Sequence, residues 1–304
     1  MKFKQHTFKA MGGPVDVKLY GATQSLLVEA CKGIEDEVFR LEKKYSRYRD
    51  DSIATAINHT AKEGGKISVD TETASLLNYA NVAHQQSDGL FDITSGVLRE
   101  IWDFKTLTSP PAEQSIKALL ERVGWHHVSW AGSELSFQKK EMELDFGGYV
   151  KEYAADCAAG VCRQMGVLSG VLNLAGDIVI LGPKPDESPW EIGIRHPRAP
   201  ESAYALVAMN AGAIATSGDY ERFFIHEKTR YCHILNPKTG YPVQSMASVT
   251  VCADSCLVAG TASTITMLRE EDGPDWIANL GLPYLLLNQK LEPSGTISAV
   301  QQPI

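Results

Sequence analysis

The spacing of apolar residues changes along this chain, and this change limits the folds that it can adopt. Helical spacing dominates the first half, where it predicts helices over residues 25–45, 71–86 and about 111–123. The second half mainly alternates as strands do, with predicted strands around residues 142–146, 171–181, 192–194, 206–208, 248–253, 285–287 and 297–300, and with predicted helices over 149–165 and 256–269. Because helices and antiparallel-looking strands come in blocks and do not strictly alternate, the sequence predicts an α+β fold.

Shorter signals complete this outline. Residues 14–20 alternate between apolar and polar, which predicts a half-buried strand, whereas residues 45–59 are polar and irregular. Asp70 is well placed as the N-cap of the second predicted helix. No stretch has the Pro, Gly and Ser composition of a long linker, so residues 1–304 are expected to form a single domain or two intimate lobes.

The composition indicates a globular protein without a nucleic-acid surface. The chain has 304 residues, of which 44% are hydrophobic and 22% are charged, and this is enough to bury a sizeable core. Its net charge is −8, whereas a nucleic-acid surface normally needs a basic face. We therefore expect no nucleic acid among its partners.

The start of the chain and its cysteines favour an intracellular location. The N-terminus has no apolar stretch of signal-peptide length, and no run approaches the roughly 18 residues that span a bilayer. The six cysteines form no C-x-x-C pair, which is typical of buried, reduced thiols. We expect a cytoplasmic protein without a membrane anchor.

Four clusters combine glycine with charged and hydroxyl-bearing side chains at predicted turns, and the first lies at residues 89–104. Asp92 and Thr94 are spaced so that they can bind nearby backbone N–H groups, and Trp102 follows. A well-made loop with Trp102 in the core would explain these residues. A loop that lines a cofactor with an aromatic wall would explain them as well.

The second cluster lies at residues 144–156. A predicted strand ends at Asp145, two glycines turn the chain, and a helix begins. Helix N-termini attract anions through free N–H groups and the macrodipole, so Lys151 in the first turn is unfavourable unless a negative ligand is present. An ordinary turn with a surface lysine is the alternative.

The third cluster is Asn173 to Asp177, where a carboxylate interrupts an apolar segment. A buried carboxylate needs hydrogen-bond donors or a metal. If Asp177 instead faces solvent at a sheet edge, it needs neither.

The fourth cluster joins Thr216-Ser217-Gly218 with His233. The first three residues offer hydroxyls and backbone donors at a tight turn. The unperturbed pKa of histidine, about 6.5, suits proton transfer near neutrality. A lone histidine is more often structural, but this one lies near Arg222 and Lys238 in the sequence.

Common nucleotide and hydrolase motifs do not occur in this sequence. It has no G-x-x-x-x-G-K-[ST], no H-E-x-x-H, no G-x-S-x-G, and no G-x-G-x-x-G after a predicted strand. The absence of these motifs therefore argues against the P-loop, zinc-protease, α/β-hydrolase and Rossmann classes.

The order and spacing of the clusters resemble the ApbE family of FAD:protein FMN transferases, from about Phe8 to Leu268. Residues 145–156 are similar to the family signature D-x-G-G-x-x-K-x-Y-A-x-D. Residues 216–218 with 233–240 are similar to T-S-G…H-I-x-[DN]-P-x-T-G. Shorter similarities lie at residues 10–12, 45–58 and 89–104.

This resemblance implies a fold and a reaction. The fold would be α+β, related to the T-fold, with mixed, largely antiparallel sheets, packed helices and an FAD cleft between two lobes. The reaction would take FAD as donor with Mg²⁺ across its pyrophosphate, attach FMN to a Thr or Ser of a target flavoprotein, and release AMP. His233 would lie near the transferred phosphate and deprotonate the acceptor hydroxyl.

The resemblance also implies a set of site residues in this chain. The catalytic residues would be His233 and Lys151, and the metal ligands would be the Val150 carbonyl, Thr264 and Glu152. The cofactor-binding residues would be Met11, Ser46, Tyr48, Asn58, Phe91, Asp92, Thr94, Trp102, Asp145, Lys151, Asp177, Thr216, Ser217 and His233.

The chain departs from the family pattern at a few positions. Gly260 stands where the family's A-D-A-x-[AS]-T run has a metal-binding aspartate. Glu152 and Val150 stand where glycine and alanine are usual, and Ala175 replaces a glycine. We hypothesise that Glu152 supplies the carboxylate that is missing at Gly260.

Three functions agree with these residues. The first is transfer of FMN to a protein. The second is a Mg²⁺-dependent FAD pyrophosphatase, which would release FMN and AMP without a protein acceptor. The third is a non-catalytic FAD carrier, which the loss of a metal-binding carboxylate at Gly260 keeps open.

Overall fold

A computed structural model describes residues 1–297 and 300–301 of the chain, and an eight-stranded sheet lies at its centre. The strand order is β1-β2-β6-β7-β10-β13-β14-β15, and each neighbouring pair is antiparallel. The predicted α+β fold with largely antiparallel sheets is thus confirmed. The strands are β1 (Lys2–Ala10), β2 (Gly13–Gly21), β6 (Ser169–Leu174), β7 (Asp177–Gly182), β10 (Gly212–Gly218), β13 (Met246–Ala253), β14 (Tyr284–Asn288) and β15 (Pro293–Gly295).

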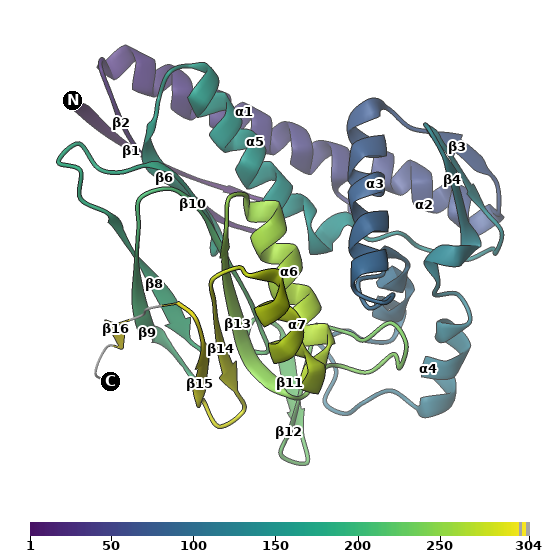
Figure 1. Cartoon of the computed structure of the whole chain (residues 1–304). Helices are drawn as coiled ribbons and strands as arrows, with labels where there is room; N and C mark the ends of the chain where they lie inside the picture. Colours follow the sequence, from purple (N-terminus) through teal and green to yellow (C-terminus); the bar gives the residue numbers. More distant parts are fainter. Residues whose placement is uncertain (298–299, 302–304) are drawn as a thin grey trace.

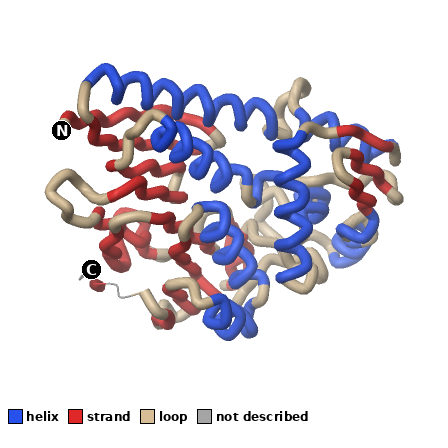
Figure 2. The backbone as a smooth tube through the Cα atoms, turned by 45° about the horizontal axis from the view of Figure 1, so that its top comes forward, coloured by secondary structure: helices blue, strands red, loops and turns tan. Residues whose placement is uncertain are grey.

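Both faces of this main sheet are covered (Figures 1 and 2). Successive strand residues point to opposite faces, so Val179 packs with the helices whereas Ile180 packs with a second sheet. The helix layer consists of α1 (Gln24–Tyr45), α5 (Val150–Gln164) and α6 (Cys256–Leu268), with α7 (Gly273–Leu280) against α6. The second sheet consists of β8 (Trp190–His196), β9 (Ala199–Met209) and β16 (Val300–Gln301).

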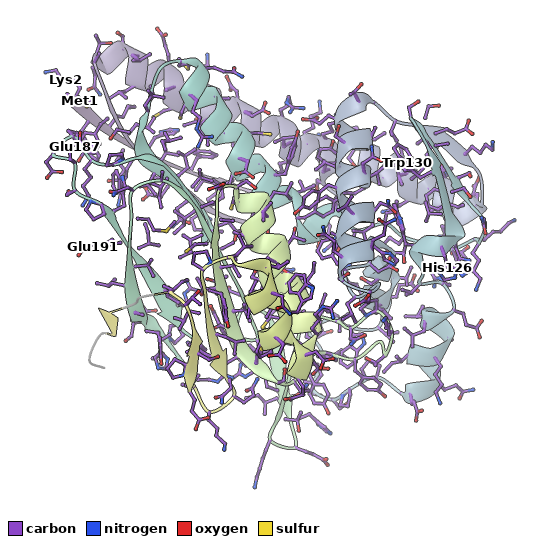
Figure 3. The ribbon with its side chains drawn as sticks, viewed as in Figure 1. Met1, Lys2, His126, Trp130, Glu187 and Glu191 are labelled. Atoms are coloured by element: carbon purple, nitrogen blue, oxygen red, sulfur yellow. The ribbon has the colours of Figure 1, made fainter. Side chains whose placement is uncertain are left out.

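The remaining elements lie beside the main sheet, on the side that Figure 3 marks with His126 and Trp130. One hydrophobic cluster continues from Leu172 in the main sheet through Leu77 to Leu135 in a small sheet, so the two parts share a core. These elements are α2 (Ile53–Glu63), α3 (Thr71–Gln86), α4 (Glu113–Leu120), and the small sheet of β3 (Lys66–Ser68), β5 (Glu134–Phe137) and β4 (Val128–Ala131). A hairpin of β11 (Phe223–His226) and β12 (Thr229–Cys232) projects from the main body (Figure 1).

Short 3-10 turns connect several of these elements. They are η1 (Ile93–Glu100), η2 (Trp125–His127), η3 (Phe146–Gly148) and η4 (Glu270–Asp272). The first and third lie at predicted site residues, because η1 contains Thr94 and follows Asp92, whereas η3 follows Asp145 and leads into α5.

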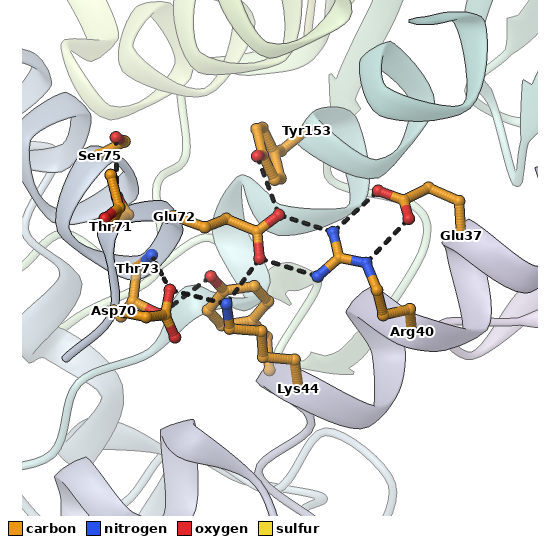
Figure 4. Close-up of polar contacts among 10 residues, drawn as sticks. Glu37, Arg40, Lys44, Asp70, Thr71, Glu72, Thr73, Ser75 and Tyr153 are labelled. Carbon is orange, nitrogen blue, oxygen red and sulfur yellow. Dashed lines mark hydrogen bonds and ion pairs between the residues drawn. The ribbon is translucent and has the colours of Figure 1, made fainter. Parts of the chain in front are cut away.

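An ion-pair network fixes α1, α3 and α5 relative to one another (Figure 4). Glu72 of α3 lies 2.7 Å from Arg40 Nη2 and 2.6 Å from Lys44 Nζ, both on α1. Tyr153 of α5 donates to the same carboxylate at 3.2 Å, and Arg40 also pairs with Glu37. The hydrogen bond from Arg40 lowers the pKa of Glu72 to about 2, against the opposing effect of burial. The network thus fixes the position of α5, which carries several of the predicted site residues.

Several predicted elements are confirmed and two are wrong. The second helix is capped as predicted, since Thr73 N donates to Asp70 Oδ1 at 3.0 Å. Residues 45–59 are not irregular throughout, because Ser52 caps α2 by accepting from Thr55 N at 3.0 Å. Residues 142–146 alternate but form no strand, because their polar backbone groups bind a side chain and a loop instead of a neighbouring strand.

Other predictions need smaller adjustments. The third helix ends at Leu120, before the predicted Val123, and the segment 171–181 is a β6–β7 hairpin with its turn at Ala175-Gly176. The predicted strand at 297–300 falls partly on 298–299, outside the described residues. All six cysteines are free, and only Cys157 is not fully buried. In the described part of the chain, none of the helices combines the length and the hydropathy that a membrane crossing requires.

Candidate active site

The direction of α5 is fixed by the segment that precedes it. Asn58 acts as a side-chain clamp on Leu144, because Leu144 N donates to Asn58 Oδ1 at 2.8 Å and Asn58 Nδ2 donates to Leu144 O at 3.0 Å. Asp145 Oδ1 then accepts from Gly147 N at 2.8 Å and closes η3. The helix begins directly afterwards at Val150, so its first turn has one defined orientation.

An ion pair joins the first turn of α5 to the main sheet. Lys151 Nζ lies 2.6 Å from Asp177 Oδ2, and the Asp177 side chain is only 7% exposed. The tight turn that presents Asp177 has Ala175 and Gly176 at positive φ, with Gly176 N donating to Asn173 Oδ1 at 2.8 Å. Burial raises the pKa of the Asp177 carboxyl above its usual range. Burial, the largest single effect, lowers the pKa of Lys151, but the charges of Asp177 and Glu152 and the hydrogen bond to Asp177 together outweigh it and raise that pKa.

Glu152 is a buried acid beside this ion pair. It is 9% exposed, and among the described residues its Oε2 has no hydrogen-bond partner. Burial, and then the charge of Asp177, raise the pKa of Glu152 to about 8. Its carboxyl group lies against Gly260 of α6. A buried carboxylate without a donor is costly, so this arrangement indicates a site that is completed by something else.

Hydroxyl groups of β10 and α6 meet on the helix side of the main sheet. Ser217 Oγ lies 2.8 Å from Ser263 Oγ and 2.9 Å from Thr264 Oγ1. Thr216 points to the opposite face, because strand residues alternate, and its Oγ1 lies 2.8 Å from Thr250 Oγ1 on β13. Ser217 therefore shares a face with Thr264, whereas Thr216 does not.

His233 follows β12 at the base of the projecting hairpin. Its backbone N donates to Arg222 O at 3.0 Å, which fixes the hairpin where it leaves the sheet. Among the residues that the structure describes, the buried Nδ1 of His233 has no partner. Burial, and then the positive charges of Arg222 and Lys151, lower the pKa of His233 to about 4. The ring is therefore neutral at pH 7 and can accept a proton.

An aromatic stack supports the loop after His233. Trp102 Nε1 donates to Gly240 O at 2.8 Å, and Gly240 has a φ of 73° that favours glycine. The Trp102 ring stacks on Phe104 and Tyr231 with centroids 5.8 and 6.1 Å apart. Trp102 thus lies in a separate hydrophobic cluster and fixes the turn at Asn236-Pro237.

The Asp92 and Thr94 side chains are engaged within the protein. Asp92 Oδ1 accepts from Thr94 N at 2.8 Å and from Thr94 Oγ1 at 2.6 Å, while Asp92 Oδ2 accepts from Trp125 N at 3.0 Å. The neighbouring Phe91 is buried and packs edge-on against Tyr149 at 6.0 Å. These contacts fix the loop next to the start of α5.

A more solvent-exposed group of predicted residues follows the C-terminal end of α1. Asp145 accepts from Arg47 Nη1 at 2.9 Å, and Arg47 lies over the Tyr48 ring at 5.1 Å. Tyr48 is 83% exposed, and its backbone N donates to Ser46 Oγ at 3.3 Å. Met11 lies at the β1–β2 turn with a φ of 51°.

Five predicted side chains come together, and we call them the central cluster: Lys151, Glu152, Asp177, Ser217 and Thr264. They come from α5, β7, β10 and α6, and the charge of Lys151 acts on His233. Of the other predicted residues, Val150 begins α5, Asn58 lies in α2 and His233 follows β12. The rest lie in the loops around α5, at the ends of α1 and β1, or, for Thr216, on the other face of the sheet.

Two residues that the motifs did not single out contribute to this region. Arg99 of η1 binds both Asp145 and Glu143. Ser263 joins the hydroxyl group at Ser217. Two carboxylates that lie close together, such as Glu143 and Asp145, need a cation, and this need could have pointed to Arg99. Ser263 could have been found because it directly precedes Thr264 in the sequence.

The donor atoms of the central cluster suit a hard cation. Within the described ranges, no three His, Cys, Asp or Glu side chains are arranged to hold a metal ion. A cation here would also need hydroxyl and carbonyl oxygens, which Thr264 and the Val150 backbone can offer. Oxygen ligands of this kind suit Mg²⁺, and the unpaired Oε2 of Glu152 fits such a role.

Comparison with known proteins identifies similar sequences and structures. The sequence profile described as "ApbE family" matches residues 11–286. A FAD:protein FMN transferase of Vibrio cholerae is 30% identical over 267 residues, which cover 84% of this chain and 79% of that protein. Another of Klebsiella pneumoniae is 32% identical over 259 residues, which cover 81% of this chain and 76% of that protein. The crystal structure of the ApbE protein of Thermotoga maritima matches with a TM-score of 0.88 and 28% identity over 97% of each chain.

Proposed function

The chain belongs to the ApbE family, and from this premise we propose that it transfers FMN from FAD to a Thr or Ser hydroxyl of a target flavoprotein and releases AMP. The observation that carries the proposal is the central cluster with its neutral histidine. A lysine, two buried carboxylates and two hydroxyls from four elements lie together, and the charge of Lys151 acts on His233. Such a site can bind a phosphate, hold a cation and accept a proton.

In the proposed reaction, the acceptor hydroxyl oxygen attacks the phosphorus atom of the FMN half of FAD. The bond from this phosphorus to the bridging pyrophosphate oxygen breaks, and AMP leaves with that oxygen. His233 takes the proton of the hydroxyl, for which its pKa of about 4 keeps the ring unprotonated at neutral pH. Lys151 stabilises the negative charge of the phosphates.

The residues around the start of α5 would hold Mg²⁺. When bound, this ion would neutralise charge on the pyrophosphate. The proposed ligands are the backbone carbonyl of Val150, the hydroxyl of Thr264 and the carboxylate of Glu152. The support for this set is its oxygen chemistry and the unpaired Glu152 Oε2.

The other predicted cofactor-binding residues would act on FAD in two ways. Exposed Tyr48 offers a ring face for stacking, next to the Arg47 guanidinium. Asn58 and Asp92 would act by fixing the loops around α5, since their polar groups are already engaged there. The FAD is proposed to lie between the main sheet with its helices and the part that contains α3.

The partners and the location of the reaction follow from the same proposal. The protein partner is a flavoprotein with an accessible Thr or Ser. A cytoplasmic location, the lack of a membrane anchor and the lack of a nucleic-acid partner stay predictions from the sequence.

The proposal is tested by incubating the purified chain with FAD and Mg²⁺, with and without a flavin-acceptor domain that carries a Thr. AMP is followed by chromatography, and flavin on the acceptor by its fluorescence on a denaturing gel. We expect AMP together with a fluorescent acceptor band. AMP without the band would favour the FAD pyrophosphatase. No AMP with any divalent metal would favour the flavin carrier.

A histidine pair tests the proposed base. His233→Ala should lower the transfer rate by about 10²- to 10⁴-fold, the usual contribution of a positioned base. His226→Ala is the matched control, because His226 lies on the same hairpin and contacts Thr108 O on the surface. Equal rates for the two variants would exclude the proposed role of His233.

A further inference from the structure

Gly260 of α6 and Glu152 of α5 compete for one space. An ideal Cβ on Gly260 would lie 2.6 Å from Glu152 Cγ and 2.8 Å from Glu152 Oε1. Real Cβ atoms do not approach other heavy atoms so closely, so a side chain at 260 would force the glutamate out of its position. The Glu152 carboxyl group thus stands where a side chain from position 260 would begin.

The surroundings of this space are those of a cation site. Residues four apart share one face of a helix, so a side chain at 260 and Thr264 would point the same way. Thr264 Oγ1 already meets Ser217 Oγ at 2.9 Å. Glu152 brings a carboxylate to this face, and its Oε2 lacks a partner in the described part of the chain although the residue is only 9% exposed. A buried carboxylate of this kind is stabilised by a bound cation.

We propose that Glu152 supplies from α5 the charged ligand of a divalent-cation site that a residue at 260 would otherwise supply from α6, and that Gly260 is required to make room for it. The inference rests on the proposed function, because the cation would serve the pyrophosphate of FAD. Positions 152 and 260 are therefore expected to have coupled effects on cation binding. Changing either position alone removes or displaces the carboxylate, whereas changing both together moves it from one helix to the other.

Three variants of the full chain test this coupling. Glu152→Gln keeps the shape of the side chain and removes its charge. Gly260→Ala keeps the glutamate and fills its space. The double variant Glu152→Ala with Gly260→Asp moves the carboxylate to α6. Glu221→Gln is the control for charge alone, since exposed Glu221 also acts on Asp177 through its charge but pairs with Arg195 on the surface.

The measurement is Mn²⁺ binding, followed by the loss of the free-ion electron paramagnetic resonance signal, with and without FAD. Mn²⁺ prefers the same oxygen ligands as Mg²⁺. We expect Glu152→Gln and Gly260→Ala each to bind at least about ten-fold more weakly. The double variant should recover most of this loss, and the control should bind as the unmodified chain does. Thermal unfolding of each variant identifies any that fails to fold, and Glu152→Gln keeps the packing in any case.

The outcomes separate this inference from the proposed transfer. Unchanged Mn²⁺ affinity in Glu152→Gln, or an unmodified chain that binds no Mn²⁺ even with FAD, would overturn the inference. Unchanged affinity in Gly260→Ala would show that no room is needed. An unmodified chain that binds Mn²⁺ through Glu152 but never modifies an acceptor would refute the transfer and leave the cation ligand standing.

Discussion

Replacing Asp92 by alanine should destabilise the protein strongly, because its carboxylate holds three donors inside the loop at η1. These donors are Thr94 N at 2.8 Å, Thr94 Oγ1 at 2.6 Å and Trp125 N at 3.0 Å. A hydrogen bond to a charged group contributes about 1.5–3 kcal/mol, and these three bonds share one carboxylate, so their sum is not additive. We expect the free energy of unfolding to fall by about 3–5 kcal/mol. In a domain of this size the Tm then drops by roughly 5–8 °C.

Urea unfolding followed by tryptophan fluorescence measures this loss. Asp103→Ala is the matched control, because Asp103 accepts from Lys105 N at 3.0 Å and from Thr106 Oγ1 at 2.8 Å in a similar turn, but on the exposed surface. The control should unfold much closer to the unmodified chain. If Asp92→Ala lost under about 1 kcal/mol while FAD affinity fell steeply, the reasoning would be refuted, and Asp92 would have to contact FAD directly.

Three further results are expected. At saturating Mg²⁺, which keeps Glu152 ionised, the acid limb of the kcat/KM profile should lie near pH 4, because the pKa of His233 is lowered to about 4; a limb near 6.5 would contradict this. Glu72→Gln should lower the free energy of unfolding by roughly 1 kcal/mol, since Glu72 meets Arg40 at a partly exposed site. The control Glu134→Gln removes an exposed pair with Lys66 and should cost much less. The pKa of Glu72 is lowered to about 2 in the folded protein, whereas it is about 4.3 in the unfolded chain. The stabilisation by the Glu72 carboxylate is therefore complete above about pH 4.3 and is lost as the pH falls towards 2. Unfolding curves of Glu72→Gln and the unmodified chain at pH 7 and pH 3 test this pH dependence. Asn58→Ala should cost about 1–3 kcal/mol through its two hydrogen bonds to the loop before η3 and should weaken FAD binding, which calorimetry can measure.

The sequence predicted those elements whose own residues determine them. The helix α1 and the Asp70 cap of α3 follow from apolar spacing and from a side chain at a helix start. The edge strand β1 escaped notice because its side chains are mostly exposed, and the strands of the small sheet because they are only three or four residues long. Residues 142–146 were predicted as a strand but do not form one. Alternation alone is not enough, because a strand also needs a neighbouring strand to pair with.

The site was predicted in part, for a related reason. The motifs singled out Lys151, Asp177 and Ser217, but spacing along the chain could not show that α5, β7 and β10 bring them to one point. Nor could it show that Thr216 lies on the far face of the sheet from its neighbour. The sequence raised as a hypothesis that Glu152 replaces the carboxylate missing at Gly260, but it could not show that the two positions exclude each other, because this depends on how two helices pack.

The most direct test of the central claim is the intact mass of an acceptor flavoprotein after incubation with FAD, Mg²⁺ and a small amount of this chain, with AMP measured in the same sample. We expect the acceptor to gain the mass of one FMN group on a Thr or Ser, with one AMP for each modified molecule. An acceptor of unchanged mass, whether FAD stays intact or AMP is formed without flavin transfer, would show that this chain does not transfer FMN to that acceptor.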